Sequence, residues 1–303
     1  MKNLFYCLLL SFFYFSASAQ TASEPSLETM STTNNVAPDE QNDYNVEELP
    51  WYRRRFKFTA GAFMPINNTE IRVGNSSGSI GTDIDLEDDL GFTESTASFL
   101  ASFEWRVSRR SRFSLEYFYL NRDATKTIDK QIEFGDEVFD LNAKVSAFFD
   151  TQIIRFAYSY AILSKPKYEA GLLVGAHVLL GDMGLKLEAN GQTAEVRDNF
   201  DFTAPLPDVG IWGEFVISKR FGAYANVNYL SAKIDNVDGS IISYNVSVLY
   251  NVYKNFNLTA GYTGLTFDLD VEKENRNGYL KWGYNGPAIT VSYNFGSHVL
   301  PKK

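Results

Sequence analysis

The sequence predicts an all-β protein: a single antiparallel up-and-down transmembrane β-barrel of about ten strands, with eight or twelve strands as alternatives. Three observations favour this fold. Apolar residues recur at every second position, connections alternate between short and long, and no stretch after residue 20 is apolar for long enough to form a membrane helix. Strands can cross lipid only in a closed barrel, because backbone polar groups have no partners there.

The first 19 residues have the three parts of a secretory signal peptide. Lys2 supplies the positive start, the residues from Leu4 to Phe15 are apolar, and Ala17-Ser18-Ala19 is a small-residue cleavage site. The apolar part is too short for a transmembrane anchor, which needs about 20 residues. The sequence therefore predicts residues 1–19 as signal peptide, 20–50 as a disordered periplasmic linker rich in polar residues, 51–296 as the barrel and 297–303 as a short tail.

Composition excludes several functional classes. The only cysteine, Cys7, lies within the signal peptide, so we expect the mature protein to have no disulfide, thiol nucleophile or thiolate metal site. The two histidines are isolated, which argues against a zinc site. The net charge of −9 argues against nucleic-acid binding, because no basic face is available for phosphates. We expect no cofactor.

Alternating segments define the predicted strands. In Thr96–Val107, for example, Phe99, Phe103 and Trp105 fall on one face, and Ser98, Ser102 and Glu104 fall on the other. The predicted strands are residues 54–65, 95–107, 112–122, 143–163, 167–181, 207–219, 221–234, 241–252, 256–270 and 279–295. The alternation in the fourth strand slips near Asp150–Arg155.

Alternation alone also fits a soluble β-sandwich, so the connections decide between the two folds. The short connections are Ser108–Ser111, Ser164–Lys167, Lys219–Arg220 and Tyr253–Asn255, and the long ones include Pro65–Glu94, Arg122–Ala143 and Gly181–Pro207. Short turns at one end and long loops at the other are typical of outer-membrane barrels.

The charges follow the same division between the two ends. The short turns carry the basic residues Arg109, Arg110, Arg112, Lys165, Lys167, Lys219, Arg220 and Lys254, while the first long loop is acidic. Basic turns suit the anionic phospholipid head groups of the inner leaflet. Acidic loops would face outward, where divalent ions could bridge them to lipopolysaccharide. We therefore expect the protein in the cell outer membrane, with its lipids and lipopolysaccharide as partners.

Several motifs carry a resemblance. They are GTDIDLEDDLGF at Gly81–Phe92, then FEWRVSRRSRFSLEYF, IEFGDEVFD, the pair Phe149-Asp150, GAHVLLG and PLPDVG. Together they resemble an uncharacterised family of small Gram-negative outer-membrane β-barrel proteins, over most of the chain after the linker. The resemblance implies location and fold but no activity, so it assigns no functional residues.

The last predicted strand, GPAITVSYNF, resembles the carboxy-terminal strand that the barrel-assembly machinery recognises, which ends on an aromatic residue. We therefore expect that machinery as a partner during biogenesis. The tail from Gly296 to Lys303 departs from the usual ending at the chain terminus.

The acidic first loop has two interpretations. Its carboxylates form a candidate cation site, because hard ions such as calcium bind several oxygens; these residues are Asp83, Asp85, Glu87, Asp88 and Asp89. It is not an EF-hand loop, because Asp88 stands where the sharp turn needs glycine. The preferred interpretation is a solvated loop attached to the barrel mouth by Ile84, Leu86, Leu90 and Phe92.

Charged residues also fall on the inward face of the predicted strands. They are Lys57, Glu104, Arg106, Glu116, Arg155, Glu169, His177 and Glu214. Unpaired buried charges are costly, so these side chains should pair and fill a barrel of this size. A filled lumen predicts a non-enzymatic scaffold whose acidic outer loops bind ions, lipid or a partner. The alternative is a narrow channel for small polar solutes.

A lipid- or peptide-hydrolysing barrel is the second alternative. Asp83 and Asp85 imitate one aspartate pair of the omptin proteases, but the Asp-x-His pair is missing, because Gly175 stands two positions before His177 and His298 lies in the tail. A serine nucleophile would need a histidine oriented by a third group. Glu169 shares the face of His177 but should lie about 26 Å away. We therefore expect His177 to be a hydrogen-bonded lumen residue.

Overall fold

The computed structural model describes residues 51–75, 77, 81–188, 197–234, 236–273 and 276–299. The predicted signal peptide and linker lie outside these residues. Within them the chain is all β, and no helix is long and apolar enough to span a bilayer.

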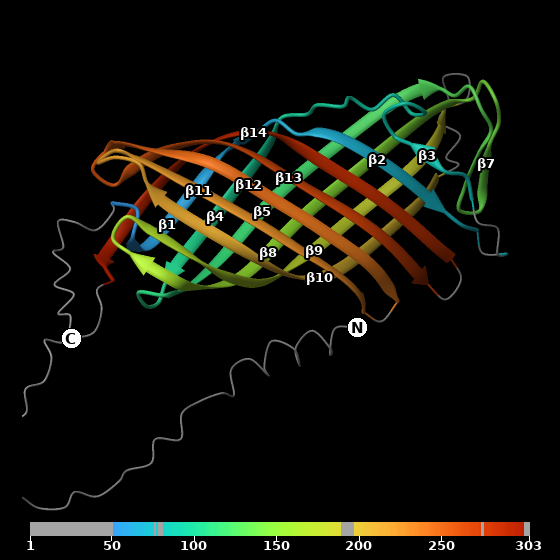
Figure 1. Ribbon diagram of the computed structural model, residues 1–303. Helices are drawn as coiled ribbons and strands as arrows, with labels where there is room; N and C mark the ends of the chain where they lie inside the picture. Colours follow the sequence, from blue (N-terminus) through green and yellow to red (C-terminus); the bar gives the residue numbers. More distant parts are fainter. Residues whose placement is uncertain are drawn as a thin grey trace, which may run out of the picture. The chain divides into compact units, whose positions relative to one another are not determined.

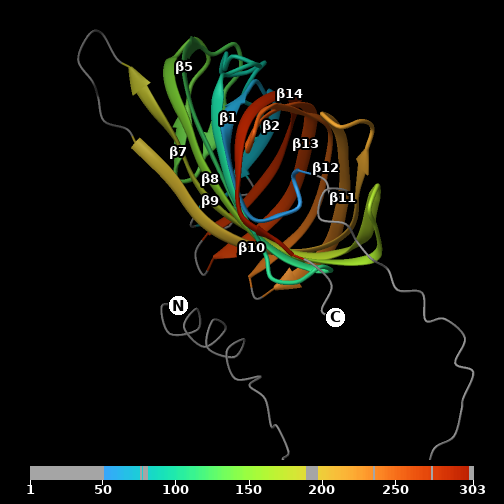
Figure 2. The same ribbon diagram turned by 90° about the vertical axis from the view of Figure 1, so that its left-hand side faces the viewer.

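Ten antiparallel strands close into a ring, and each pairs with the next along the chain (Figure 1). They are β1 (Arg54–Phe63), β4 (Ser98–Arg106), β5 (Ser111–Thr127), β8 (Lys144–Lys165), β9 (Tyr168–Glu188), β10 (Arg197–Val216), β11 (Phe221–Ile234), β12 (Val237–Tyr253), β13 (Phe256–Lys273) and β14 (Arg276–His298). β14 pairs with β1 and closes the barrel, which Figure 2 shows as a ring of strands seen from one end. The predicted up-and-down barrel is confirmed.

Four shorter strands lie outside this ring. β2 (Ile66–Val73) follows β1 after Met64 and Pro65, and it pairs with β14 where β1 stops. The two-residue β3 (Ile84–Asp85) pairs with β2, and β6 (Ile132–Phe134) forms a small hairpin with β7 (Glu137–Phe139). We call the end of the barrel with the short connections the turn end, and the end with β3, β6 and β7 the loop end.

The strands run much further toward the loop end than the alternation predicted. The predicted loop Gly181–Pro207 is wrong in most of its length, because residues 182–188 continue β9 and residues 197–206 belong to β10. The first predicted loop likewise contains β2 and β3. β14 runs to His298, which pairs with Arg54, so this histidine lies in a strand and not in the predicted tail.

Near the turn end, the outward faces of the strands form a continuous apolar belt. On β8 the exposed outward residues are Ile154, Phe156 and Tyr160. Other exposed members of the belt are Phe103, Trp105, Leu115, Leu172, Val174, Ile211, Val227, Val246, Leu258 and Val291. The belt spans about nine residues of β8, which matches the length of strand that crosses a bilayer.

Toward the loop end the inward face becomes apolar and the outward face becomes polar, the reverse of the arrangement near the turn end. On β8 the inward residues Val145, Ala147 and Phe149 are buried and apolar, while Ser146 and Asp150 lie outward. The register with β5 and β9 shows no irregularity through this stretch. The slip predicted near Asp150–Arg155 is therefore no bulge. It marks where the outward face passes from an apolar to an aqueous environment.

Two substitutions on the outward face of β8 test the position of the belt. We expect Phe156→Arg to destabilise the barrel in lipid vesicles by about 2–4 kcal/mol, because a cation near the bilayer centre is costly. Gln152→Arg, four residues toward the loop end, should cost at most about 1 kcal/mol. Urea unfolding in vesicles measures both, and equal costs would contradict the assigned edge of the belt.

Candidate functional site: the lumen

An ionic layer fills the lumen at the turn end. Arg106 Nη1 lies 2.9 Å from Glu169 Oε2, and Arg112 Nη1 lies 2.6 Å from Glu214 Oε1. These four side chains come from β4, β5, β9 and β10, and they are almost completely buried. Longer contacts of 3.4–3.8 Å join Arg112 to Glu104, Lys57 to Glu104 and Arg106 to Glu214. The layer is thus one network and not a set of separate pairs.

The residues before β1 close this layer from the turn end. Arg53 donates a hydrogen bond to the Lys165 carbonyl at 2.7 Å, and its Nε lies 3.7 Å from Glu169 Oε2. Tyr52 is buried beside it, and burial together with nearby Glu214 raises the pKa of its phenol, which therefore stays neutral. The side chains of Tyr52 and Arg53 therefore help to fill the lumen at the turn end.

Arg112 also stacks on an aromatic ring. Its guanidinium lies 3.7 Å from the centre of the Trp212 ring, and the Trp212 indole donates to the Leu172 carbonyl at 3.1 Å. Cation–π contact suits a desolvated guanidinium. The arrangement fixes Arg112 between a carboxylate and an aromatic face.

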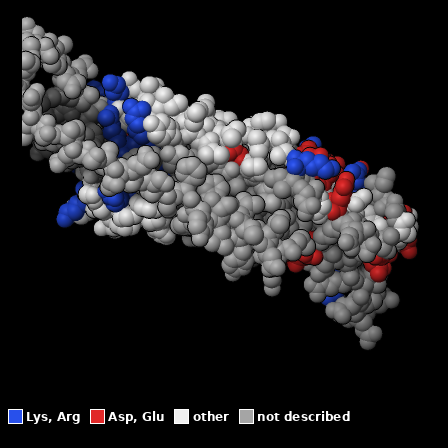
Figure 3. Space-filling model, turned by 90° about the horizontal axis from the view of Figure 1, so that it is seen from below, with Lys and Arg blue, Asp and Glu red and all other residues white. Residues whose placement is uncertain are grey.

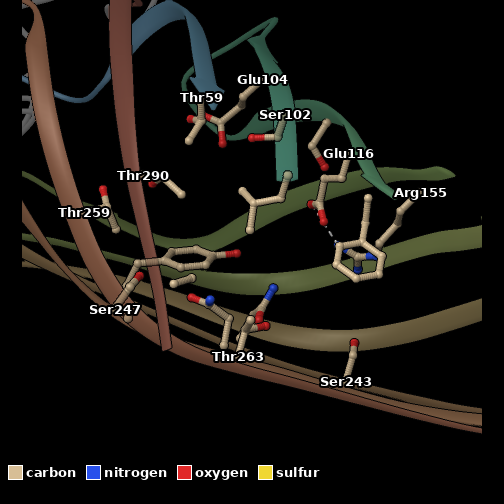
Figure 4. Close-up of a pocket in the computed structure, with 18 of the residues that line it drawn as sticks. Thr59, Ser102, Glu104, Glu116, Arg155, Ser243, Ser247, Thr259, Thr263 and Thr290 are labelled. Atoms are coloured by element: carbon tan, nitrogen blue, oxygen red, sulfur yellow. Dashed lines mark hydrogen bonds and ion pairs between the residues drawn. The ribbon is translucent and has the colours of Figure 1, made fainter. Parts of the chain in front are cut away.

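A cavity of about 290 Å³ lies in the middle of the lumen. Hydroxyl and amide side chains line much of it, including Thr59, Ser102, Ser243, Ser247, Thr259, Thr263 and Thr290 (Figure 4). The carboxylates Glu104, Glu116 and Glu214 and the cations Lys57, Arg112 and Arg155 also reach it. Its lining suits water or a small polar molecule.

Arg155 organises the charged side of this cavity. Its Nη1 lies 3.1 Å from Glu116 Oε1, and these two side chains point toward each other in Figure 4. Its Nε lies 3.1 Å from Asp208 Oδ2, an atom that is 2.8 Å from His177 Nδ1. The sequence has Gly175, and not an aspartate, two positions before His177. In the structure the neighbouring strand β10 supplies a carboxylate there, because Asp208 is the cross-strand partner of Gly175.

An apolar layer fills the lumen at the loop end. Trp282 is at its centre and packs against the rings of Phe149, Phe267, Tyr284 and Phe118. Further buried members come from β9 and β10, among them Leu179, Met183, Leu185, Phe200, Phe202 and Leu206. We call this set the Trp282 cluster.

The acidic first loop completes the Trp282 cluster. Asp85 caps a single helical turn, because its Oδ1 accepts from the Asp88 amide at 2.8 Å. Asp89 Oδ2 accepts from the Asp85 amide at 2.9 Å, and Gly91, with φ +75°, ends the turn. The buried side chains that this turn sends inward are Ile84, Leu86, Leu90 and Phe92. The expected attachment of this loop at the barrel mouth agrees with this packing.

The five carboxylates of the candidate cation site do not converge. Asp83 pairs with Arg72 at 2.8 Å, and Asp89 pairs with Lys130 at 2.6 Å. Glu87 points inward, where it accepts from the Thr69 amide at 2.8 Å and pairs with Arg122. In the described part of the chain, no three His, Cys, Asp or Glu side chains form a group that could hold a metal ion. The acids instead shape and fasten the loop.

The structure brings all eight residues that the alternation placed inward into one of two groups. Arg106, Glu169, Glu214, Glu104 and Lys57 meet in the ionic layer, and Glu116, Arg155 and His177 meet at the cavity.

Sequence reasoning missed Arg53, Asp208 and Arg112. The prediction that Arg112 belongs to a basic turn is wrong, because this residue begins the inward face of β5. An even spacing along a strand could have revealed both residues. Arg112 stands two positions before Ser114 and four before Glu116, and Asp208 stands six positions before Glu214, so each shares the inward face of its strand.

Surface charge divides between the two ends. Figure 3 shows Lys and Arg gathered toward one end of the visible face, and Asp and Glu toward the other, with some Lys and Arg among them. The short connections at the turn end carry Arg109, Arg110, Lys165, Lys167, Lys219, Arg220 and Lys254. The two ends therefore present different surfaces.

Comparisons with known proteins identify the fold class. The outer membrane protease OmpT of Escherichia coli shares the fold with a TM-score of 0.50 and 11% identity, over 83% of this chain and 100% of that one. The translocator domain of the autotransporter NalP of Neisseria meningitidis has a TM-score of 0.46 and 8% identity, over 79% of this chain and 88% of that one. The likeness to OmpT shows that the chain has the fold of an outer-membrane β-barrel protein.

No protein-family model matches the sequence. No curated protein matches it either. The resemblance to one particular barrel family therefore stays a prediction, and similarity at this level of identity extends to the fold alone.

Removing one carboxylate from the ionic layer should destabilise the barrel strongly. We expect Glu169→Ala to lower the free energy of unfolding by about 3–5 kcal/mol, because it leaves Arg106 buried without its nearest carboxylate. Glu116→Ala is the comparison, since its side chain is 44% exposed, and it should cost about 1 kcal/mol or less. Urea unfolding followed by tryptophan fluorescence measures both, and similar costs would contradict the ionic layer as a stabilising network.

Proposed function

We propose that this chain is an integral protein of the Gram-negative outer membrane that acts as a non-conducting, non-enzymatic scaffold. The observation that carries the proposal is that side chains fill the lumen at both ends, with an ionic layer at the turn end and the Trp282 cluster at the loop end. The scaffold holds the loop-end part of the barrel outside the membrane.

The outward surface supports this location. The apolar belt suits the hydrocarbon core of a bilayer, and the polar faces beyond it suit water or lipid sugars. The basic short turns favour the periplasmic side, where they meet anionic head groups, so the loop end would face outward. Fractionation on a sucrose gradient and heat-dependent gel mobility test the location. Recovery of the protein in a membrane-free fraction, with the same gel mobility before and after boiling, would oppose this location.

The layers at the two ends of the lumen argue against a channel. A solute would have to displace two layers of different chemistry that lie in series, and opening one layer leaves the other in place. We expect no stable conductance steps from the wild-type protein in planar bilayers, and none from Arg106→Ala, because the Trp282 cluster still blocks the path. Discrete steps in the wild type would overturn the scaffold. Steps in the variant alone would show that the ionic layer is the only barrier.

The hydrolase has one observation in its favour, since Asp208 lies 2.8 Å from His177 as an orienting carboxylate would. His177 lines the cavity, but both side chains are almost completely buried, and Asp208 is also held by Arg155. We expect His177→Ala to leave the lipid A and outer-membrane protease profiles of cells unchanged. A changed profile in this variant, with wild-type protein levels and gel mobility, would favour the enzyme.

A further inference from the structure

The wall of the barrel lacks a stretch of strand at the loop end. β4 begins at Ser98, and its pairing with β5 starts at the Phe99–Tyr119 pair. Beyond that pair β5 continues to Thr127 with β8 on one edge, and in the described part of the chain no strand pairs with its other edge. β2 continues to Val73, and among the described residues the two-residue β3 is the strand on its outer edge, where the Leu86 amide also donates to the Thr69 carbonyl. This leaves a lateral interval between β2 and β5.

Residues Ile84–Phe92, which we call the stopper segment, occupy this interval. Four apolar side chains, those of Ile84, Leu86, Leu90 and Phe92, are at most 4% exposed and join the Trp282 cluster. The Glu87 carboxylate is held between strands, because it accepts from Thr69 of β2 and pairs with Arg122 of β5. Arg122 also donates to the Thr93 carbonyl at 3.1 Å. Backbone contacts with β2 also hold the segment, because β3 pairs with β2 and the Leu86 amide donates to the Thr69 carbonyl at 2.9 Å. We call the contacts of the Glu87 carboxylate with Thr69 and Arg122 the clasp.

A row of basic residues faces three consecutive residues of the stopper segment. Arg122 pairs with Glu87, Lys126 donates to the backbone carbonyl of Asp88, and Lys130 pairs with Asp89 at 2.6 Å. The basic residues stand four positions apart along β5 and its continuation. The stopper segment thus presents an anionic part to this row and an apolar part to the Trp282 cluster.

The lower margin of the interval lies at the edge of the apolar belt. Its exposed side chains are those of Met64, Ile66, Phe99 and Tyr119. Ile66 forms a bridge to Ser95, and this bridge marks the base of the interval. A hydrocarbon chain in the adjoining leaflet would meet these apolar side chains at the edge of the interval.

We propose that the stopper segment holds the place of an anionic amphiphile, which binds between β2 and β5 when the segment moves out. The hydrocarbon chain packs against the Trp282 cluster, in place of Leu86, Leu90 and Phe92. The head group, a carboxylate or a phosphate, pairs with Arg122 and Lys126, since both groups accept paired hydrogen bonds from a guanidinium. This site goes beyond the scaffold role and does not depend on whether the lumen conducts.

Two variants that break the same ion pair should have opposite effects on binding. Glu87→Gln weakens the clasp and leaves Arg122 free for a head group, so it should increase binding of an anionic amphiphile. Arg122→Gln weakens the same clasp and removes the head-group partner, so it should not. We expect about tenfold more interior labelling in Glu87→Gln than in the wild type, which corresponds to a change of about 1.4 kcal/mol.

The probe is a photoreactive fatty acid with a diazirine in its chain, applied to the full-length barrel in detergent micelles. Mass spectrometry then locates the label, which is expected on peptides containing Trp282 or Phe149. Asp83→Asn is the matched control, because it breaks the exposed Arg72–Asp83 pair of the same loop outside the apolar site, and it should leave the labelling unchanged. Heat-dependent gel mobility verifies that each variant is folded.

A reversible lock tests whether the segment must move. Glu70 and Asp85 are direct cross-strand partners, so cysteines at both positions can form a disulfide. With Glu87→Gln in the same protein, the oxidised form should lose interior labelling and the reduced form should regain it. Equal interior labelling of the oxidised and reduced forms would contradict the proposal that the stopper segment must move before an amphiphile binds.

Three probes define the head group. A photoreactive phosphatidylglycerol tests a phosphate source, the fatty acid tests a carboxylate source, and photoreactive phosphatidylcholine is the control with no net charge. Interior labelling by either anionic probe, increased in Glu87→Gln but not in Arg122→Gln, supports the site. Equal labelling by phosphatidylcholine, equal behaviour of the two variants, or label confined to the outer belt would each overturn it.

Discussion

The change of medium along each strand is the constraint on which the rest of the structure depends. A strand in lipid must show apolar side chains outward, and the same strand in water must show polar ones. Because successive side chains alternate without interruption, β8 meets both demands only by exchanging the chemistry of its two faces near Asp150. The inward face of β8 then changes from polar residues near the turn end to apolar residues near the loop end. The polar lumen within the membrane and the apolar lumen beyond it both follow from this exchange.

The two layers of the lumen stabilise the barrel in different ways. Beyond the membrane the ring encloses the Trp282 cluster, and burial of its apolar side chains stabilises this part much as a core stabilises a soluble β-protein. Within the membrane the outer belt contacts lipid, so the lumen can hold charges. Those charges need partners, and the contacts Glu169–Arg106, Arg106–Glu214 and Glu214–Arg112 form a chain that spans four strands. Loss of one member therefore affects several strands at once.

The sequence predicted most of the barrel because the apolar belt imposes a simple rule on each strand. Ten strands, the short turns and the inward phase of Glu104, Arg155 and Glu214 all follow from alternation inside the membrane. The same rule failed beyond it. The predicted loop Gly181–Pro207 is wrong over residues 182–188 and 197–206, where apolar residues such as Met183 and Phe202 lie on the face that is polar nearer the turn end. Asp208 was missed as the partner of His177, because cross-strand register is not visible in one strand.

The acidic loop follows from the same constraint. Where β4 stops short, the exposed edges of β2 and β5 and the apolar lumen behind them must be covered. A further strand would cover the edges, but the short helical turn of the stopper segment covers the lumen as well, because Leu86 and Leu90 lie on one face of it. Its acids then have separate tasks: Asp85 caps the turn, and Glu87 joins it to both neighbouring strands through Thr69 and Arg122. The segment is also held by the two-residue pairing of β3 with β2, by Lys126 and Lys130, and by side-chain packing. It still has fewer backbone pairings than any strand of the ring, and segments with few backbone pairings open more readily than paired strands.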